Sequence, residues 1–204
     1  ADRGLVVAGP DDAFGVSKAA VAKLGEATVF PVFADPLSDA RFGTHRHRAN
    51  VVGAYDGFLA PPVYETWPDP DVILRFGASP TSKALRTYLS SLDARQFVVD
   101  PAGEWREATF TASDLLVADP TRFAERLAET VSRSPDEDWH ERLATAAVTH
   151  WETVAEMATA SLEGAYLERV VSGAPDPATL VVANSMPVRD LDRFGPPRDA
   201  DLTV

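Results

Sequence analysis

Short apolar runs alternate with amphipathic stretches along the first two thirds of the chain. The runs have the length of strands and most end beside Gly or Pro, which is typical of buried strands. They cover residues 4–9, 28–33, 71–76, 96–99 and 109–118. Apolar residues at helical spacing predict helices around 16–24 and over 48–59, 83–92 and 120–133, the first of them capped by Asp11 or Asp12. This alternation predicts a doubly wound, parallel α/β sheet.

The pattern changes after residue 133. A long helix is predicted over 139–159, a further helix over 163–171, and a strand over 179–183 followed by a turn. We expect a domain boundary near residue 160, with 1–160 as one α/β domain and 161–204 as the beginning of a second. The chain starts without Met just before a strand and ends as another strand begins. We therefore expect a fragment of a longer protein.

Composition narrows the functional classes. The net charge of −12 disfavours nucleic acid and anionic membranes as partners, and no apolar stretch is long enough to span a bilayer. The absence of Cys excludes disulfides and thiolate sites, and it is compatible with a cytoplasmic location. Only three of the 19 basic residues are Lys. The scarcity of Lys, together with the excess of acidic residues that gives the negative net charge, indicates a salt-adapted, halophilic proteome. The alternative is an ordinary acidic protein from a high-GC genome.

The most suggestive polar group follows the strand predicted at 179–183. Ligands of parallel α/β folds bind at the carboxyl ends of strands. Ser185 and Arg189 stand four residues apart, so on a helix they would project together and clamp one carboxylate. The alternative is that Ser185 caps the helix and Arg189 pairs with Asp190 or Asp192.

A second candidate is the loop 77–82, which leads from a strand into a helix beginning with Lys83. This geometry suits an anion. The loop lacks the second Gly and the hydroxyl residue of a nucleotide-triphosphate loop, so Lys83 is either a lone cation aimed at an acidic ligand or a surface lysine. His45 and His47 have no third ligand nearby, which disfavours a metal site.

Three segments carry a resemblance to a known family. They are 33–38 (Phe-Ala-Asp-Pro-Leu-Ser), 74–83 (Leu-Arg-Phe-Gly-Ala-Ser-Pro-Thr-Ser-Lys) and 182–190 (Val-Ala-Asn-Ser-Met-Pro-Val-Arg-Asp). In order and spacing they resemble 2-succinyl-5-enolpyruvyl-6-hydroxy-3-cyclohexene-1-carboxylate synthases, the thiamine-diphosphate enzymes of menaquinone biosynthesis. Asn-Ser-Met-Pro-Val-Arg-Asp is the most specific of the three, and the resemblance covers nearly the whole chain.

The resemblance implies a central Rossmann-like domain, residues 1–160, and the beginning of the C-terminal pyrophosphate-binding domain, residues 161–204. It implies a transferase, or carboligase, that decarboxylates 2-oxoglutarate and adds the succinyl carbanion to isochorismate. The cofactors would be thiamine diphosphate with Mg²⁺ or Mn²⁺, and the whole enzyme would be a homodimer or homotetramer. The alternative is a stand-alone α/β domain that binds an acidic small molecule or a protein partner.

Family positions that bind substrate carboxylates match Ser185 and Arg189, and a basic position near them matches Lys83. Some members carry Arg directly after that lysine, whereas this chain has Ala84. The activating glutamate and the magnesium ligands of the family match no residue here. We therefore expect no catalytic residue and no bound metal or cofactor in the fragment, assign no cofactor ligand, and predict that it is inactive alone.

Overall fold

The computed structural model describes residues 1–11, 15–131, 136–157 and 163–204. Within them, one sheet contains six parallel strands in the order β3-β2-β1-β4-β5-β6. The strands are β1 (Gly4–Ala8), β2 (Val32–Ala34), β3 (Val51–Val52), β4 (Val72–Phe76), β5 (Arg95–Val99) and β6 (Asp114–Leu116). The order reverses between β1 and β4, which lie side by side. This confirms the predicted doubly wound, Rossmann-like α/β sheet.

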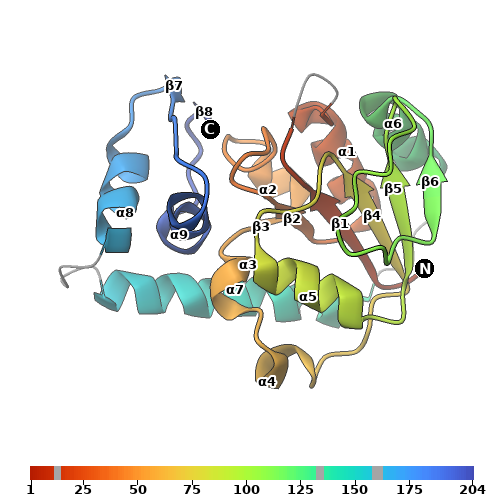
Figure 1. Ribbon diagram of the computed structural model, residues 1–204, viewed down its shortest axis with the longest axis horizontal. Helices are drawn as coiled ribbons and strands as arrows, with labels where there is room; N and C mark the ends of the chain where they lie inside the picture. The colour runs from red at the N-terminus through yellow and green to blue at the C-terminus, as the bar shows by residue number, and fades with distance from the viewer. Residues whose placement is uncertain (12–14, 132–135, 158–162) are drawn as a thin grey trace.

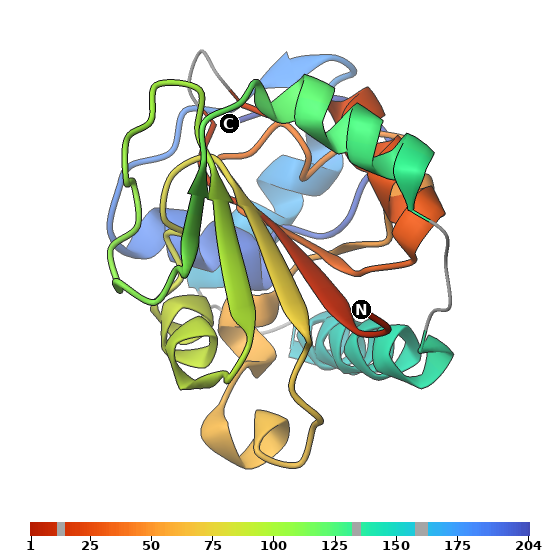
Figure 2. The same ribbon diagram turned by 90° about the vertical axis from the view of Figure 1, so that its right-hand side faces the viewer.

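Helices cover both faces of the sheet (Figures 1 and 2). On one face lie α1 (Lys18–Thr28) and α6 (Pro120–Thr130), and on the other lie α3 (Tyr55–Phe58), α5 (Lys83–Ser91) and α7 (Glu137–Met157). Successive side chains of a strand point to opposite faces. Val6 of β1 therefore packs toward α1 and α6, while its neighbour Leu5 packs toward α5 and α7. The apolar runs at β1 and β4 are therefore strands buried from both sides, whereas the run predicted over 109–118 gives only the half-buried β6.

The prediction of one helix over 48–59 was wrong. Within it, α2 (Arg46–Ala49) ends at Asn50 in the left-handed conformation, and Val51–Val52 form β3 beside β2. Ala54 is also left-handed, with φ of 64°, before α3 begins. The β-branched valines favour a strand, and the two left-handed residues break any continuous helix. A further short helix, α4 (Pro61–Tyr64), follows α3.

The boundary between the first helix and the second strand also differed from the prediction. α1 continues to Thr28, and Val29 closes it in the left-handed conformation, so β2 starts only at Val32. The cap of α1 is Ser17, whose hydroxyl accepts a hydrogen bond from the amide of Ala20 at 3.3 Å. Asp11 instead accepts from the amide of Asp39 at 2.8 Å, and Asp12 lies outside the described residues.

The last part of the chain packs around a separate small apolar cluster. Its elements are α8 (Glu163–Gly173), β7 (Ala178–Thr179), α9 (Met186–Phe194) and β8 (Leu202–Thr203), with β7 and β8 paired in parallel. Val171, Leu191 and Leu202 pack with Phe42 of the first part. The strand predicted over 179–183 shrinks to two residues, and Val181 is 92% exposed. The expected domain boundary near 160 falls outside the described residues and stays a prediction.

Within the described ranges, every helix is too short or too polar to cross a membrane.

Candidate functional site

Two loops meet closely where β1 and β4 end side by side. A Cβ atom added to Gly9 would lie 1.9 Å from the carbonyl oxygen of Ala78, and Gly77 has a φ of 74°. Both positions therefore require glycine. The loop from Gly77 is held by the buried carboxylate of Asp35, which accepts hydrogen bonds of 2.8 Å from the amide and the hydroxyl of Thr81. Burial raises the pKa of Asp35.

This loop determines where Lys83 lies. The Ser82 hydroxyl accepts a hydrogen bond of 3.0 Å from the amide of Leu85 and caps α5. Lys83 is consequently the first residue of α5 and is exposed. The partial positive charge of a helix N-terminus adds to the charge of its ammonium group. The sequence between β4 and α5 therefore places positive charge at the carboxyl edge of the sheet.

The helix α9 is attached to the sheet domain by two ion pairs. Asp192 lies 3.2 Å from the Arg41 guanidinium, and Arg193 lies 2.6 Å from the Asp56 carboxylate. The Asp56 amide also donates to Asp192 at 2.9 Å. Burial raises the pKa of Asp192 to about 6, although the charge of Arg41 opposes that shift. These contacts hold α9, and with it Arg189, close to α3 and α5.

A cavity of about 520 Å³ lies between α5 and α9. Four cationic side chains and one carboxylate line it together with apolar and neutral groups: Asp56, Leu59, Pro61, Tyr64, Lys83, Ala84, Arg86, Thr87, Arg189 and Arg193. Asp56 already pairs with Arg193. Within the described ranges neither Lys83 nor Arg189 forms an ion pair with a carboxylate. In a chain with a net charge of −12, this is a local excess of positive charge suited to an acidic ligand.

The structure thus brings two of the three predicted substrate residues, Lys83 and Arg189, to one cavity. Ser185 is not among the lining residues. It is exposed at the start of α9 with a φ of 82°, its amide donates to the side chain of Asn184 at 2.8 Å, and its hydroxyl caps nothing. Asp192, one of the alternative partners considered for Arg189, pairs with Arg41 instead. A substrate-binding role for all three residues stays a prediction.

The sequence reasoning missed three charged residues of this cavity, Asp56, Arg86 and Arg193. Arg193 follows Arg189 by one helical turn, and this spacing was a usable signal. Arg86 follows Lys83 by three residues on α5, again on one face. No feature of the sequence indicated Asp56, because the residues around it were predicted to form one helix over 48–59, which the structure does not have.

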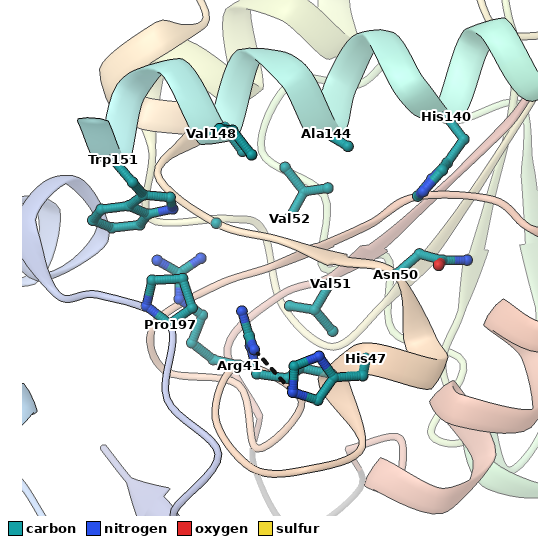
Figure 3. A pocket seen from close by; sticks show the side chains of 13 residues that line it. Arg41, His47, Asn50, Val51, Val52, His140, Ala144, Val148, Trp151 and Pro197 are labelled. Atoms are coloured by element: carbon teal, nitrogen blue, oxygen red, sulfur yellow. Dashed lines mark hydrogen bonds between the residues drawn. The ribbon is translucent and has the colours of Figure 1, made fainter. Parts of the chain in front are cut away.

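A second cavity, of about 250 Å³, lies between β3 and α7. Figure 3 shows His140, Ala144, Val148 and Trp151 of α7 on one side, with Val51, Val52 and Arg41 opposite. Its charged groups already have partners: Arg46 and His47 contact Asp199 at 3.2 and 2.8 Å. Burial lowers the pKa of His140, which favours the neutral ring. This cavity is therefore less suited to an acid than the one between α5 and α9.

The described residues contain no cluster of three His, Asp or Glu side chains that could hold a metal ion. Nε2 of His45 donates to the Ala40 carbonyl oxygen, 2.8 Å away, and His47 contacts Asp199. These residues therefore do not fit a divalent cation.

The parallel sheet and the helical layers on its two faces define a Rossmann-like α/β domain. No family model matches the chain. The chain is 54% identical to the 2-succinyl-5-enolpyruvyl-6-hydroxy-3-cyclohexene-1-carboxylate synthase of Haloarcula marismortui, over 100% of this chain and 35% of that protein. Identity to the synthase of the same name from Halobacterium salinarum is 52%, over 100% of this chain and 34% of the relative. Identity to the synthase of the same name from Bacillus cytotoxicus is 34%, over 95% of this chain and 33% of the relative.

The chain therefore belongs to the 2-succinyl-5-enolpyruvyl-6-hydroxy-3-cyclohexene-1-carboxylate synthase family, as the sequence predicted. It spans about a third of the length of the curated relatives that it matches.

Proposed function

We propose that this chain is the part of a menaquinone-pathway synthase that binds carboxylate groups of the substrates. The whole enzyme would decarboxylate 2-oxoglutarate and transfer the succinyl unit to isochorismate. The observation that carries the proposal is the cavity between α5 and α9, where Lys83 and Arg189 lack carboxylate partners among the described residues. Both substrates are acids, and the relatives are named for this synthesis.

Each side chain has a distinct part in the proposal. Arg189 offers a planar guanidinium that can bind both oxygens of one carboxylate. Lys83 offers a compact ammonium group at the N-terminus of α5, where the helix adds positive charge. Ser185, at the start of α9, would donate its hydroxyl to a substrate that extends out of the cavity. The chain's contribution is thus to bind and orient acids.

Thiamine diphosphate, with Mg²⁺ or Mn²⁺, would supply the carbanion chemistry in the whole enzyme. The residues described here offer no ligand set for the metal. The division into a central domain, 1–160, and the start of a pyrophosphate-binding domain, 161–204, belongs to the same proposal. The oligomeric state of the whole enzyme and its cytoplasmic location remain predictions.

A salt-adapted source is a further part of the proposal. It is supported by the net charge of −12 and by relatives from Haloarcula and Halobacterium. Carboxylates that repel one another at low ionic strength are screened at high salt. The unfolding temperature should therefore rise between 0.1 M and multimolar KCl, and a fall would contradict salt adaptation.

Kinetics of the full-length synthase test the proposal. Arg189→Ala should lower kcat/KM for 2-oxoglutarate or isochorismate by about tenfold or more, because a charge-assisted contact contributes roughly 1.5–3 kcal/mol. The kcat/KM of Arg189→Lys should lie between those of the parent enzyme and Arg189→Ala, because lysine keeps the positive charge but cannot bind both oxygens of a carboxylate with a planar guanidinium. Arg126→Ala is the control, because that side chain is 78% exposed on α6 and does not line the cavity. Unchanged kinetics in Arg189→Ala would remove the cavity from the substrate site.

The alternative is that the chain alone binds an acidic small molecule. The same cavity supports it, because Lys83 and Arg189 would attract any acidic molecule that fits between α5 and α9. Titration calorimetry and the kinetics together separate the two: if the chain binds 2-oxoglutarate and Arg189→Ala abolishes that binding, while Arg189→Ala leaves the kinetics of the full-length synthase unchanged, the alternative is favoured.

A further inference from the structure

Asp56 is a buried acidic residue in the wall of the cavity. Its side chain is 3% exposed, yet it is among the residues that line the cavity between α5 and α9. One carboxylate oxygen, Oδ2, accepts from Nε of Arg193 at 2.7 Å and lies 2.6 Å from Nη2. The other, Oδ1, accepts from the Ser82 hydroxyl at 2.5 Å. Both oxygens are thus engaged by protein donors.

The contact with Ser82 reaches the helix that carries Lys83. The Ser82 hydroxyl donates to Asp56 and at the same time accepts from the amide of Leu85 at 3.0 Å. Ser82 is 1% exposed, so the Asp56 carboxylate fixes the direction of this buried hydroxyl. The N-terminus of α5, and therefore the backbone of Lys83, is held against Asp56.

The contact with Arg193 reaches the helix that carries Arg189. The two arginines are one helical turn apart on α9, so fixing Arg193 fixes the rotation of α9 about its axis. A second contact also holds α9 in place: the Asp56 amide donates to Oδ2 of Asp192 at 2.9 Å. Asp56 thus holds α9 through its backbone and its side chain.

Asp56 is a poor candidate for a substrate ligand. An anion with both oxygens occupied would repel an acid and has no donor to offer it. Its charge does, however, offset that of Arg193. Of the other cations that line the cavity, Arg86 donates to the carbonyl groups of Pro80 and Thr81, whereas Lys83 and Arg189 form no ion pair with a carboxylate among the described residues. The effect of Asp56 on an acidic ligand is therefore indirect.

We infer that Asp56 is a positioning residue, which ties α5 to α9 and so sets the separation of Lys83 and Arg189 for the acidic substrate. The inference rests on the proposed function. Nothing in the local sequence around Asp56 indicates this role, because its partners Ser82 and Arg193 are distant along the chain. The two helices meet only in the folded protein.

The experiment compares variants of the full-length synthase in steady-state kinetics. Asp56→Asn keeps the shape of the side chain and removes its charge, and Ser82→Ala removes only the contact with α5. Asp100→Asn is the matched control: Asp100 is also buried, pairs with Arg106 at 2.7 Å, and does not line the cavity. Each variant is measured alone and combined with Arg189→Ala.

Asp56→Asn should raise the KM of the acid that Arg189→Ala affects by about tenfold, with kcat within about twofold of the parent enzyme. Ser82→Ala should raise the same KM by a smaller factor, and it serves as the test if Asp56→Asn does not fold. In the Arg189→Ala background, Asp56→Asn should add less than about twofold, because the two residues act through one contact. Asp100→Asn should leave KM unchanged.

Three results overturn the inference. If Arg189→Ala raises KM while Asp56→Asn and Ser82→Ala do not, or if the effects of Asp56→Asn and Arg189→Ala are additive, Asp56 is not a positioning residue and the proposed function stands. If Arg189→Ala itself leaves kcat/KM unchanged, the proposed function fails and the inference fails with it.

Discussion

Arg41 and Asp192 form an ion pair of 3.2 Å in which the side chains are only 3% and 2% exposed. Arg41 belongs to the loop after β2, and Asp192 to α9, so the pair joins the sheet domain to the last part of the chain. The Arg41 guanidinium also donates to the carbonyl groups of Ala34 and Asp192. A buried pair of this kind is costly to break, because the remaining charge has no water to solvate it.

Arg41→Ala should therefore destabilise the protein by about 3–5 kcal/mol, measured as the free energy of unfolding in denaturant. Arg126→Ala is the control, since its pair with Glu129 is exposed on both sides and should contribute less than about 0.5 kcal/mol. Equal losses in the two variants would contradict the structural role of the Arg41–Asp192 pair.

Gly9→Ala tests the close approach of the loops after β1 and β4. The new methyl group would overlap the Ala78 carbonyl oxygen at 1.9 Å, and backbone there cannot simply rotate away. We expect a loss of roughly 1–3 kcal/mol in the free energy of unfolding. Gly173→Ala, where no atom lies within 4 Å of the added Cβ, should change it by less than about 0.5 kcal/mol. The reverse order would mean that the two loops do not meet as described.

The sheet was predictable because strands buried on both faces read as apolar runs, as β1 and β4 do. β3 was not, since two valines between left-handed residues are too short for a pattern. The motif at 182–190 led to Arg189, and Lys83 was found as a cation after a strand. Their approach to one cavity depends on pairs such as Arg193 with Asp56, whose members are far apart along the chain. Local sequence patterns do not indicate which distant residues form such pairs.

Acid should weaken the protein through Glu107. Burial alone would raise its pKa, but hydrogen bonds from Thr109 and the charge of Arg75, 3.1 Å away, lower it to about 2. A carboxyl group whose pKa is lowered by folding stabilises the protein above its unfolded pKa, and that stability is lost as the pH falls toward the folded pKa. The contribution of Glu107 should fall by about 2 kcal/mol between pH 5 and pH 3.

Denaturant unfolding of the parent and of Glu107→Gln at pH 5 and pH 3 measures this contribution. The parent should lose more stability than the variant over that interval, by about the same 2 kcal/mol. Identical pH dependence in the two proteins would show that the Glu107 carboxylate is not held as described.

Calorimetry of the chain with thiamine diphosphate and Mg²⁺ is expected to show no binding. The reason is that the family positions for the activating glutamate and the metal match no residue here, and the described residues contain no metal-binding cluster. The full-length synthase is the positive control. Tight binding to the chain alone would contradict the assignment of these residues to the substrate side of the enzyme.

The most direct measurement is a crystal structure of the full-length synthase with 2-oxoglutarate or isochorismate bound. A substrate carboxylate should lie within about 3 Å of the Arg189 guanidinium and the Lys83 ammonium group, in the cavity between α5 and α9. If both acids bind elsewhere and neither contacts Arg189 or Lys83, the account of this cavity as the substrate site is wrong.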